Sequence, residues 1–155
     1  MLQGRWMTQE GGDGGALLAL NEIRTNTTCD LVRSWFRKGD SALDCGMIAA
    51  EQGKTFDVAC FWARLAIERY FKGFLILHAK SWLNTHDLDE LLRRCLEIEA
   101  LPGITGESLK RISECVAGQN GSGINPDRSK ARYALRVANG IKEVIMATVP
   151  DKAKP

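Results

Sequence analysis

The chain has 155 residues, of which 45% are hydrophobic and 26% are charged. This length and composition are typical of a single globular domain that buries its own core. The net charge of +2 is too small to indicate nucleic-acid binding by charge alone. No run approaches the roughly 18 apolar residues that a membrane span needs. We therefore expect a cytoplasmic protein without a membrane segment.

The five cysteines form no C-x-x-C pair, and the chain has two histidines. A zinc site needs about four such ligands, so neither a metal nor a cofactor is expected. We interpret the cysteines as small buried hydrophobic residues in a reducing compartment.

The N-terminal part predicts little order. Residues 1–15 are rich in glycine and polar residues, which is typical of disorder, and residues 16–26 indicate at most a short extra helix. We assign residues 1–27 to a flexible N-terminal segment. The first long helix is expected to start after Thr28, a favourable N-cap residue, and to end at Gly53.

The second helix has the clearest pattern, because apolar residues recur at helical spacing from Phe56 for about six turns. Thr55 is its expected N-cap, and Gly73 is its one weak position. Arg64, Glu68 and Lys72 follow one another at four-residue spacing on another face. The simplest interpretation of that ladder is support of the helix.

The segment LNTHDLDELL, residues 83–92, poses a choice between a metal site and a helix start. A His-Asp phosphohydrolase needs further histidine ligands, and His78 is the one other histidine. Asp87 precedes an apolar run, and Glu90 follows three residues later, which resembles a capping box. We therefore interpret His86-Asp87 as the start of a short third helix that Pro102 and Gly103 close.

The remaining sequence predicts two more helices. Residues 105–118 form an amphipathic segment, and Asn125 followed by Pro126 is typical of the start of a last helix that ends at Pro150. No segment alternates as a half-buried strand does. The prediction is an all-α, antiparallel up-and-down bundle of four main helices over residues 28–150, followed by a C-terminal tail of residues 151–155.

Several segments together resemble the HEPN family, whose name stands for a nucleotide-binding domain of higher eukaryotes and prokaryotes. The second helix carries Ala66, Glu68, Arg69 and Lys72 where family members have A-x-E-K-x-x-K, and His86-Asp87-Leu88 matches the H-D-L of the third helix. Around Trp35, Asp40 and Asp44 the first helix matches loosely. The chain departs from the family at residues 131–135, where ARYAL replaces R-Y-P, and at Arg69, where many members have lysine.

The resemblance covers roughly residues 28–148 and implies a helical bundle that is commonly a homodimer. Small prokaryotic members often act beside a minimal nucleotidyltransferase, as paired or toxin-antitoxin components. Some members are metal-independent ribonucleases with an R-x(4–6)-H motif, and others bind nucleotides without catalysis. Here the positions where that arginine would stand are residues 71–73 before His78 and residues 79–81 before His86. None is arginine, so we do not transfer the nuclease activity.

Two surfaces are candidates for binding. The resemblance points to a nucleotide site of Glu68, Arg69, Lys72, His86 and Asp87. Independently, a phosphate-binding stripe is indicated on the last helix, because guanidinium groups match phosphate oxygens. Its members recur every four residues and are Arg128, Arg132 and Arg136. The alternative for this stripe is an ordinary solvated helix face.

Three hypotheses about function follow. The first is a non-catalytic HEPN-like module that binds a nucleotide or RNA, or a protein partner such as a nucleotidyltransferase. The second is a metal-independent ribonuclease with a degenerate site built on Arg69, Lys72 and either His86 or His78. The third is a helical adaptor without a ligand.

Overall fold

The computed structural model describes residues 13–80, 84–117 and 125–155, and all of its regular elements there are helical. The long helices are α1 (Asp13–Gln52), α2 (Phe56–Leu77) and α5 (Arg128–Thr148). The shorter ones are α3 (Leu88–Leu96), α4 (Gly106–Ala117) and the 3-10 turn η2 (Asp151–Ala153). The predicted all-α bundle is therefore confirmed.

The start of α1 differs from the prediction. The helix begins at Asp13, and Thr28 lies inside it and donates its hydroxyl to the carbonyl of Arg24 at 2.9 Å. A threonine can satisfy its hydroxyl in this way within a helix. The alanines and leucines of residues 16–20 also favour helix. The predicted start after Thr28 is wrong, and the disorder predicted for residues 1–12 lies outside the described residues.

Helices α1 and α2 form an antiparallel hairpin whose backbones approach closely at two glycines. A Cβ on Gly73 would lie 2.6 Å from Cε1 of Phe36, and a Cβ on Gly39 would lie 2.7 Å from Cε1 of Tyr70. Both aromatic side chains are completely buried. Gly73 is thus the position at which α2 accepts a ring from α1.

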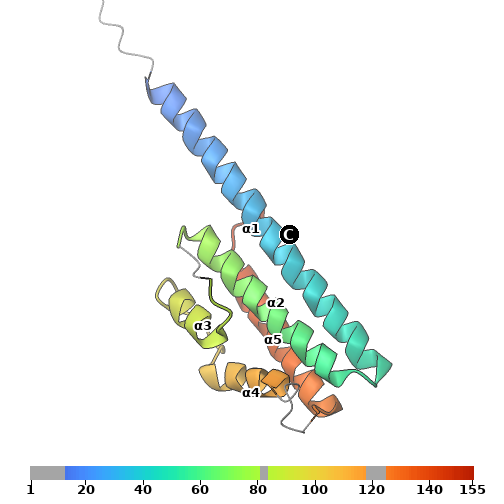
Figure 1. Ribbon diagram of the computed structural model, residues 1–155. Coiled ribbons are helices and arrows are strands. Elements are labelled where there is room, and N and C mark those ends of the chain that lie inside the picture. Colours follow the sequence, from blue (N-terminus) through green and yellow to red (C-terminus); the bar gives the residue numbers. More distant parts are fainter. Residues whose placement is uncertain (1–12, 81–83, 118–124) are drawn as a thin grey trace, which may run out of the picture.

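Helix α5 packs against both helices of this hairpin, mainly against α2 (Figure 1). It runs antiparallel to α1, because Lys142 Nζ lies 2.8 Å from Asp40 Oδ1 while Arg33 of α1 donates to the carbonyl of Lys154 at 3.1 Å. Consequently α5 runs parallel to α2, and the short helices α3 and α4 return the chain from the end of α2 to the start of α5.

The helix caps follow the prediction in part. Asp127, not Asn125, caps α5, and its carboxylate accepts from the amide of Lys130 at 2.9 Å. Asp127 is the N-cap because it stands directly before Arg128, where its side chain reaches an unpaired amide of the first turn. Thr55 occupies the N-cap of α2 without capping it and donates to the carbonyl of Ala49 instead.

The core is shared by all five helices and is richest in aromatic residues on α2. Tyr70 is fully buried, and its hydroxyl donates to Asp40 Oδ1 at 2.7 Å. Burial and that acidic neighbour raise the pKa of the Tyr70 hydroxyl. Cys29, Cys60 and Cys95 are buried as predicted, whereas Cys45 is exposed. No helix in the described ranges is long and apolar enough to cross a membrane.

Candidate functional site

The centre of the candidate site is a buried ion pair on α2. Glu68 and Lys72 are each 2% exposed, and Lys72 Nζ lies 2.8 Å from Glu68 Oε1. The sequence pattern predicted this pair as simple support on a helix face, whereas in the structure the pair is buried. Burying two charges is costly unless each is neutralised and hydrogen-bonded. The groups that cover this pair must therefore supply the remaining polar contacts.

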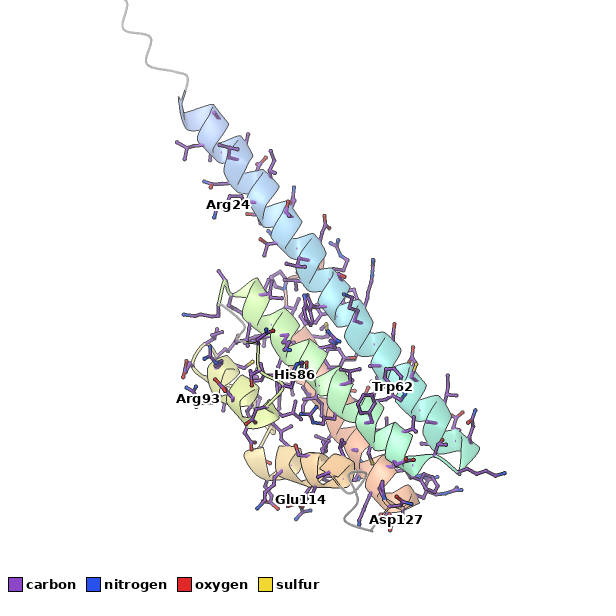
Figure 2. The ribbon with its side chains drawn as sticks, in the orientation of Figure 1. Arg24, Trp62, His86, Arg93, Glu114 and Asp127 are labelled. Carbon is purple, nitrogen blue, oxygen red and sulfur yellow. The ribbon has the colours of Figure 1, made fainter. Side chains whose placement is uncertain are left out.

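His86 packs over the pair from the segment that leads into α3. Its Nδ1 lies 2.9 Å from Glu68 Oε1, while its side chain remains 72% exposed. Arg64 fixes the backbone of the same residue, because its Nη2 donates to the carbonyl of His86 at 2.6 Å. Figure 2 shows His86 between α2 and α3. The ring is thus held on one edge and open to solvent on the other.

The charge on Glu68 determines which edge of His86 carries a proton. Burial raises the pKa of the Glu68 carboxyl, but hydrogen bonds from Lys72 and His86 outweigh it and leave the pKa below its usual value. The carboxylate is therefore ionised at neutral pH and accepts a hydrogen bond from the Nδ1–H group of His86. In the neutral imidazole, Nε2 is then an acceptor, and in the imidazolium it is a second donor.

Three cationic groups lie over the indole ring of Trp35 of α1, on the neighbouring side of α2. The Arg69 guanidinium lies 5.0 Å from the indole centroid, Lys38 Nζ lies 5.6 Å from it and Lys72 Nζ lies 6.0 Å from it. These distances are typical of cation–π contacts. Lys72 thus touches both Glu68 and Trp35, and it joins the His86 side of the site to Arg69.

Asp87 explains the His-Asp pair. Its carboxylate accepts from the amides of Asp89 at 2.9 Å and Glu90 at 3.4 Å, so it is the N-cap of α3. The second half of a capping box is absent, because Glu90 pairs with Arg94 at 3.2 Å and Thr85 accepts from the amide of Asp87 instead. Asp87 positions His86 by starting the helix directly after it.

The arginine stripe is a separate surface on the outer face of α5. Arg128, Arg132 and Arg136 are all exposed, and the Arg128 guanidinium lies 5.7 Å from the ring centroid of Phe56. Phe56 begins α2, about 18 Å along the helix from Glu68. The structure therefore does not combine the start of this stripe with the His86 cluster. Within the described part of the chain, no group of three or more histidine, cysteine or acidic residues is placed to hold a metal ion.

Comparison with known protein families identifies the family of this chain. A family model described as HEPN domain matches residues 32–148. The chain belongs to the HEPN family. That match spans all five helices from the middle of α1 to the end of α5, and it leaves residues 13–31 of α1 outside. No curated protein matches the chain. No solved structure matches it either.

Of the five residues that the HEPN resemblance selected, the structure brings three into direct contact: Glu68, Lys72 and His86. Arg69 instead lies against Trp35, and the Asp87 carboxylate is used by the cap. Sequence reasoning missed the contact of Arg64 with the His86 carbonyl. Its signal was available, because Arg64 stands one turn before Glu68 on the same helix face.

Proposed function

We propose that this HEPN chain is a non-catalytic module that binds the phosphate of a nucleotide at the exposed edge of His86. The observation that carries the proposal is the hydrogen bond from His86 to buried Glu68. It holds an exposed imidazole in one orientation without help from a ligand. A preorganised donor or acceptor loses little conformational entropy on binding, which favours affinity.

The surrounding charge favours an anion. Within the cluster, Lys38, Arg64, Arg69 and Lys72 stand against the carboxylates of Glu68 and Asp87, and the Asp87 carboxylate is used by the helix cap. Arg64 contacts His86 directly, and Arg69 adds positive charge on the Trp35 side of Lys72. Glu68, Lys72 and Asp87 act as positioning residues, because two of them are buried and the third is a helix cap. Phosphate groups are bound well by a combination of guanidinium and imidazolium donors, so the proposal places the phosphate on the protonated form of His86, in which Nε2 also donates.

The test is isothermal titration calorimetry of the purified chain with a panel of nucleoside mono- and triphosphates. We expect saturable binding of at least one nucleotide, and His86→Ala or Arg64→Ala should weaken it about tenfold, the loss expected for one charge-assisted contact. Arg132→Ala is the matched control, since it removes an exposed guanidinium from the other surface. No binding of any nucleotide at millimolar concentration would refute the proposal. Loss on Arg132→Ala alone would move the site to α5.

A ribonuclease is the second candidate, and one observation favours it. A histidine oriented by a carboxylate, with its other nitrogen free, is the arrangement that general acid–base catalysis uses. RNA cleavage by the purified chain in EDTA separates the two candidates. The non-catalytic proposal expects no cleavage by any version. Cleavage that His86→Ala abolishes and His78→Ala retains would establish the nuclease instead.

We further propose a cytoplasmic homodimer and a nucleotidyltransferase partner in a toxin-antitoxin-like pair. Support comes from membership of the HEPN family, together with the resemblance to its small prokaryotic members. Co-expression of the chain with a minimal nucleotidyltransferase encoded beside it tests the pairing, with co-purification in a fixed ratio as the expected result. If neither a nucleotide nor this partner binds, a helical adaptor is the remaining hypothesis.

A further inference from the structure

The first part of α1 is a helix without intramolecular support. We call residues 15–27 the arm, and every one of them is exposed. Figure 1 shows the arm extending beyond the other helices, and Figure 2 shows Arg24 on it, away from the body. Isolated helices of about this length are marginal in water. Leu17, Leu18, Leu20 and Ile23 are nevertheless 60%, 67%, 59% and 61% exposed.

One face of the arm combines apolar side chains with a cation. Residues spaced by three and four share a helix face, since each residue advances about 100° around the axis. Leu17, Leu20 and Arg24 have this spacing, and the exposed Leu31 continues it seven residues further on. Leu18 lies about 100° away from Leu17 and belongs to another face. In the described residues, Arg24 makes no ion pair.

A groove with the complementary properties runs along α5. We call it the α5 groove, and it contains two adjoining hollows of about 440 and 530 Å³ that share Pro102, Glu143 and Val144. Its floor on α5 also has spacings of three and four. The residues that define it are Tyr133, Val137, Gly140 and Val144 on α5, with Pro102 and Ile104 opposite. A Cβ on Gly140 would meet nothing within 4 Å, so the middle of the groove is open.

The α5 groove carries negative charge that no described cation neutralises. Glu99 and Glu143 line the second hollow, and neither forms an ion pair with another described residue. Glu143 accepts one hydrogen bond, from the Asn139 amide at 2.9 Å. An apolar groove with two carboxylates that form no ion pair with a described residue therefore fits an amphipathic helix that presents leucines and one arginine.

We propose that the arm docks in the α5 groove of a second copy of this chain, with Leu17 and Leu20 in the hollows and Arg24 facing Glu99 and Glu143. The arm cannot reach the groove of its own chain, because α1 continues without a break to Gln52 and directs the arm away from the body. Exchange of a helix between copies needs no new fold. This interface rests on the homodimer proposed above and is independent of the proposed nucleotide site.

Size-exclusion chromatography with light scattering tests the interface. Wild-type chain at micromolar concentration should have twice the 17.1 kDa mass of one chain. Leu17→Glu/Leu20→Glu should reduce it to the mass of one chain. Leu18→Glu is the control, since it places a glutamate at a similarly exposed neighbour on another face, and it should stay dimeric. A monomeric wild type would overturn the homodimer together with this interface, whereas a Leu17→Glu/Leu20→Glu variant that stays dimeric would overturn the interface alone.

Charge reversal identifies the surface that receives the arm. Glu99→Arg/Glu143→Arg changes two side chains that form no ion pair in the described structure, so the monomer should fold, and this variant alone should be monomeric. Mixed with Leu17→Glu/Leu20→Glu, it should form heterodimers, because one intact arm then meets one intact groove. Groove variants that dimerise as the wild type does, or a mixture without heterodimers, would exclude this contact. Circular dichroism of each variant verifies its fold.

Discussion

At the scale of single residues, the candidate site depends on Glu68. Its Oε1 accepts from both Lys72 and His86, so one carboxylate neutralises a buried ammonium and orients an exposed ring. Removing one member of a buried pair costs far more than replacing both, because the remaining charge is then stranded in an apolar environment.

Substitution of Glu68 tests this dependence. We expect Glu68→Gln to lower the free energy of unfolding by about 3–5 kcal/mol, because buried Lys72 then loses the carboxylate that lies 2.8 Å from its Nζ. Glu68→Gln/Lys72→Met should recover most of that loss, since both charges are removed. Urea unfolding followed by circular dichroism measures both values. Equal stabilities of the single and double variants would contradict the buried-pair account.

The same pair predicts a dependence on pH. The pKa of Glu68 is lowered in the folded chain from its ordinary value of 4.5, so its stabilisation is complete above that value and is lost as the pH falls through the folded pKa. Between about pH 6 and about pH 3, wild type should lose more unfolding free energy than Glu68→Gln/Lys72→Met does. The double variant retains every other carboxylate and is the control. Parallel curves would show that Glu68 does not contribute.

How far the sequence predicts this site can be seen from these residues. The four-residue spacing of Arg64, Glu68 and Lys72 correctly predicts one helix face. It does not predict burial, because the groups that cover Lys72 and Glu68 include Trp35 and His86, which are distant in the sequence. Asp87 was predictable, since capping depends only on residues two and three positions away.

At the scale of elements, the closeness of α1 and α2 depends on small residues at their contact. Propensity alone makes Gly39 and Gly73 weak points, whereas the structure shows that each leaves room for an aromatic ring of the other helix. A weaker local preference is accepted where it permits tighter packing.

Two glycine substitutions separate packing from propensity. Gly73→Ala should destabilise the chain by about 1–3 kcal/mol, because its Cβ would lie 2.6 Å from a ring carbon of buried Phe36. Gly140→Ala should stabilise the monomer by up to about 1 kcal/mol, since its Cβ meets nothing within 4 Å. Thermal unfolding in dilute solution compares them. A gain in stability from both would contradict the close α1–α2 contact.

Element boundaries show the limit of local signals. Apolar spacing and the signals of helix ends predicted α2, α3, α4 and α5. The start of α1 was mistaken because Thr28 has the chemistry of a cap but no break in helix propensity before it. Where several polar residues stand near a helix start, as at Asn125 and Asp127, the choice depends on which side chain reaches a free amide.

At the scale of the whole molecule, three surfaces lie on one HEPN bundle. The His86 cluster is formed by α2 and the start of α3, with Trp35 of α1 beside it. The α5 groove lies between α5 and the segment that joins α3 to α4, and the arm extends from α1. Family resemblance predicted the fold and the first surface. The arm and the groove were not predictable, because each depends on surfaces that the bundle leaves uncovered after it has packed.

Nuclear magnetic resonance of the two imidazoles tests the central claim most directly. The chain carries only His78 and His86, so side-chain ¹⁵N signals are readily assigned with His86→Gln, and His78 is an internal control. On addition of a nucleotide we predict a saturable shift of the His86 Nε2 signal, while the His78 signals stay in place. Saturable binding that leaves both His86 nitrogens unchanged would show that the nucleotide binds elsewhere and would contradict the account.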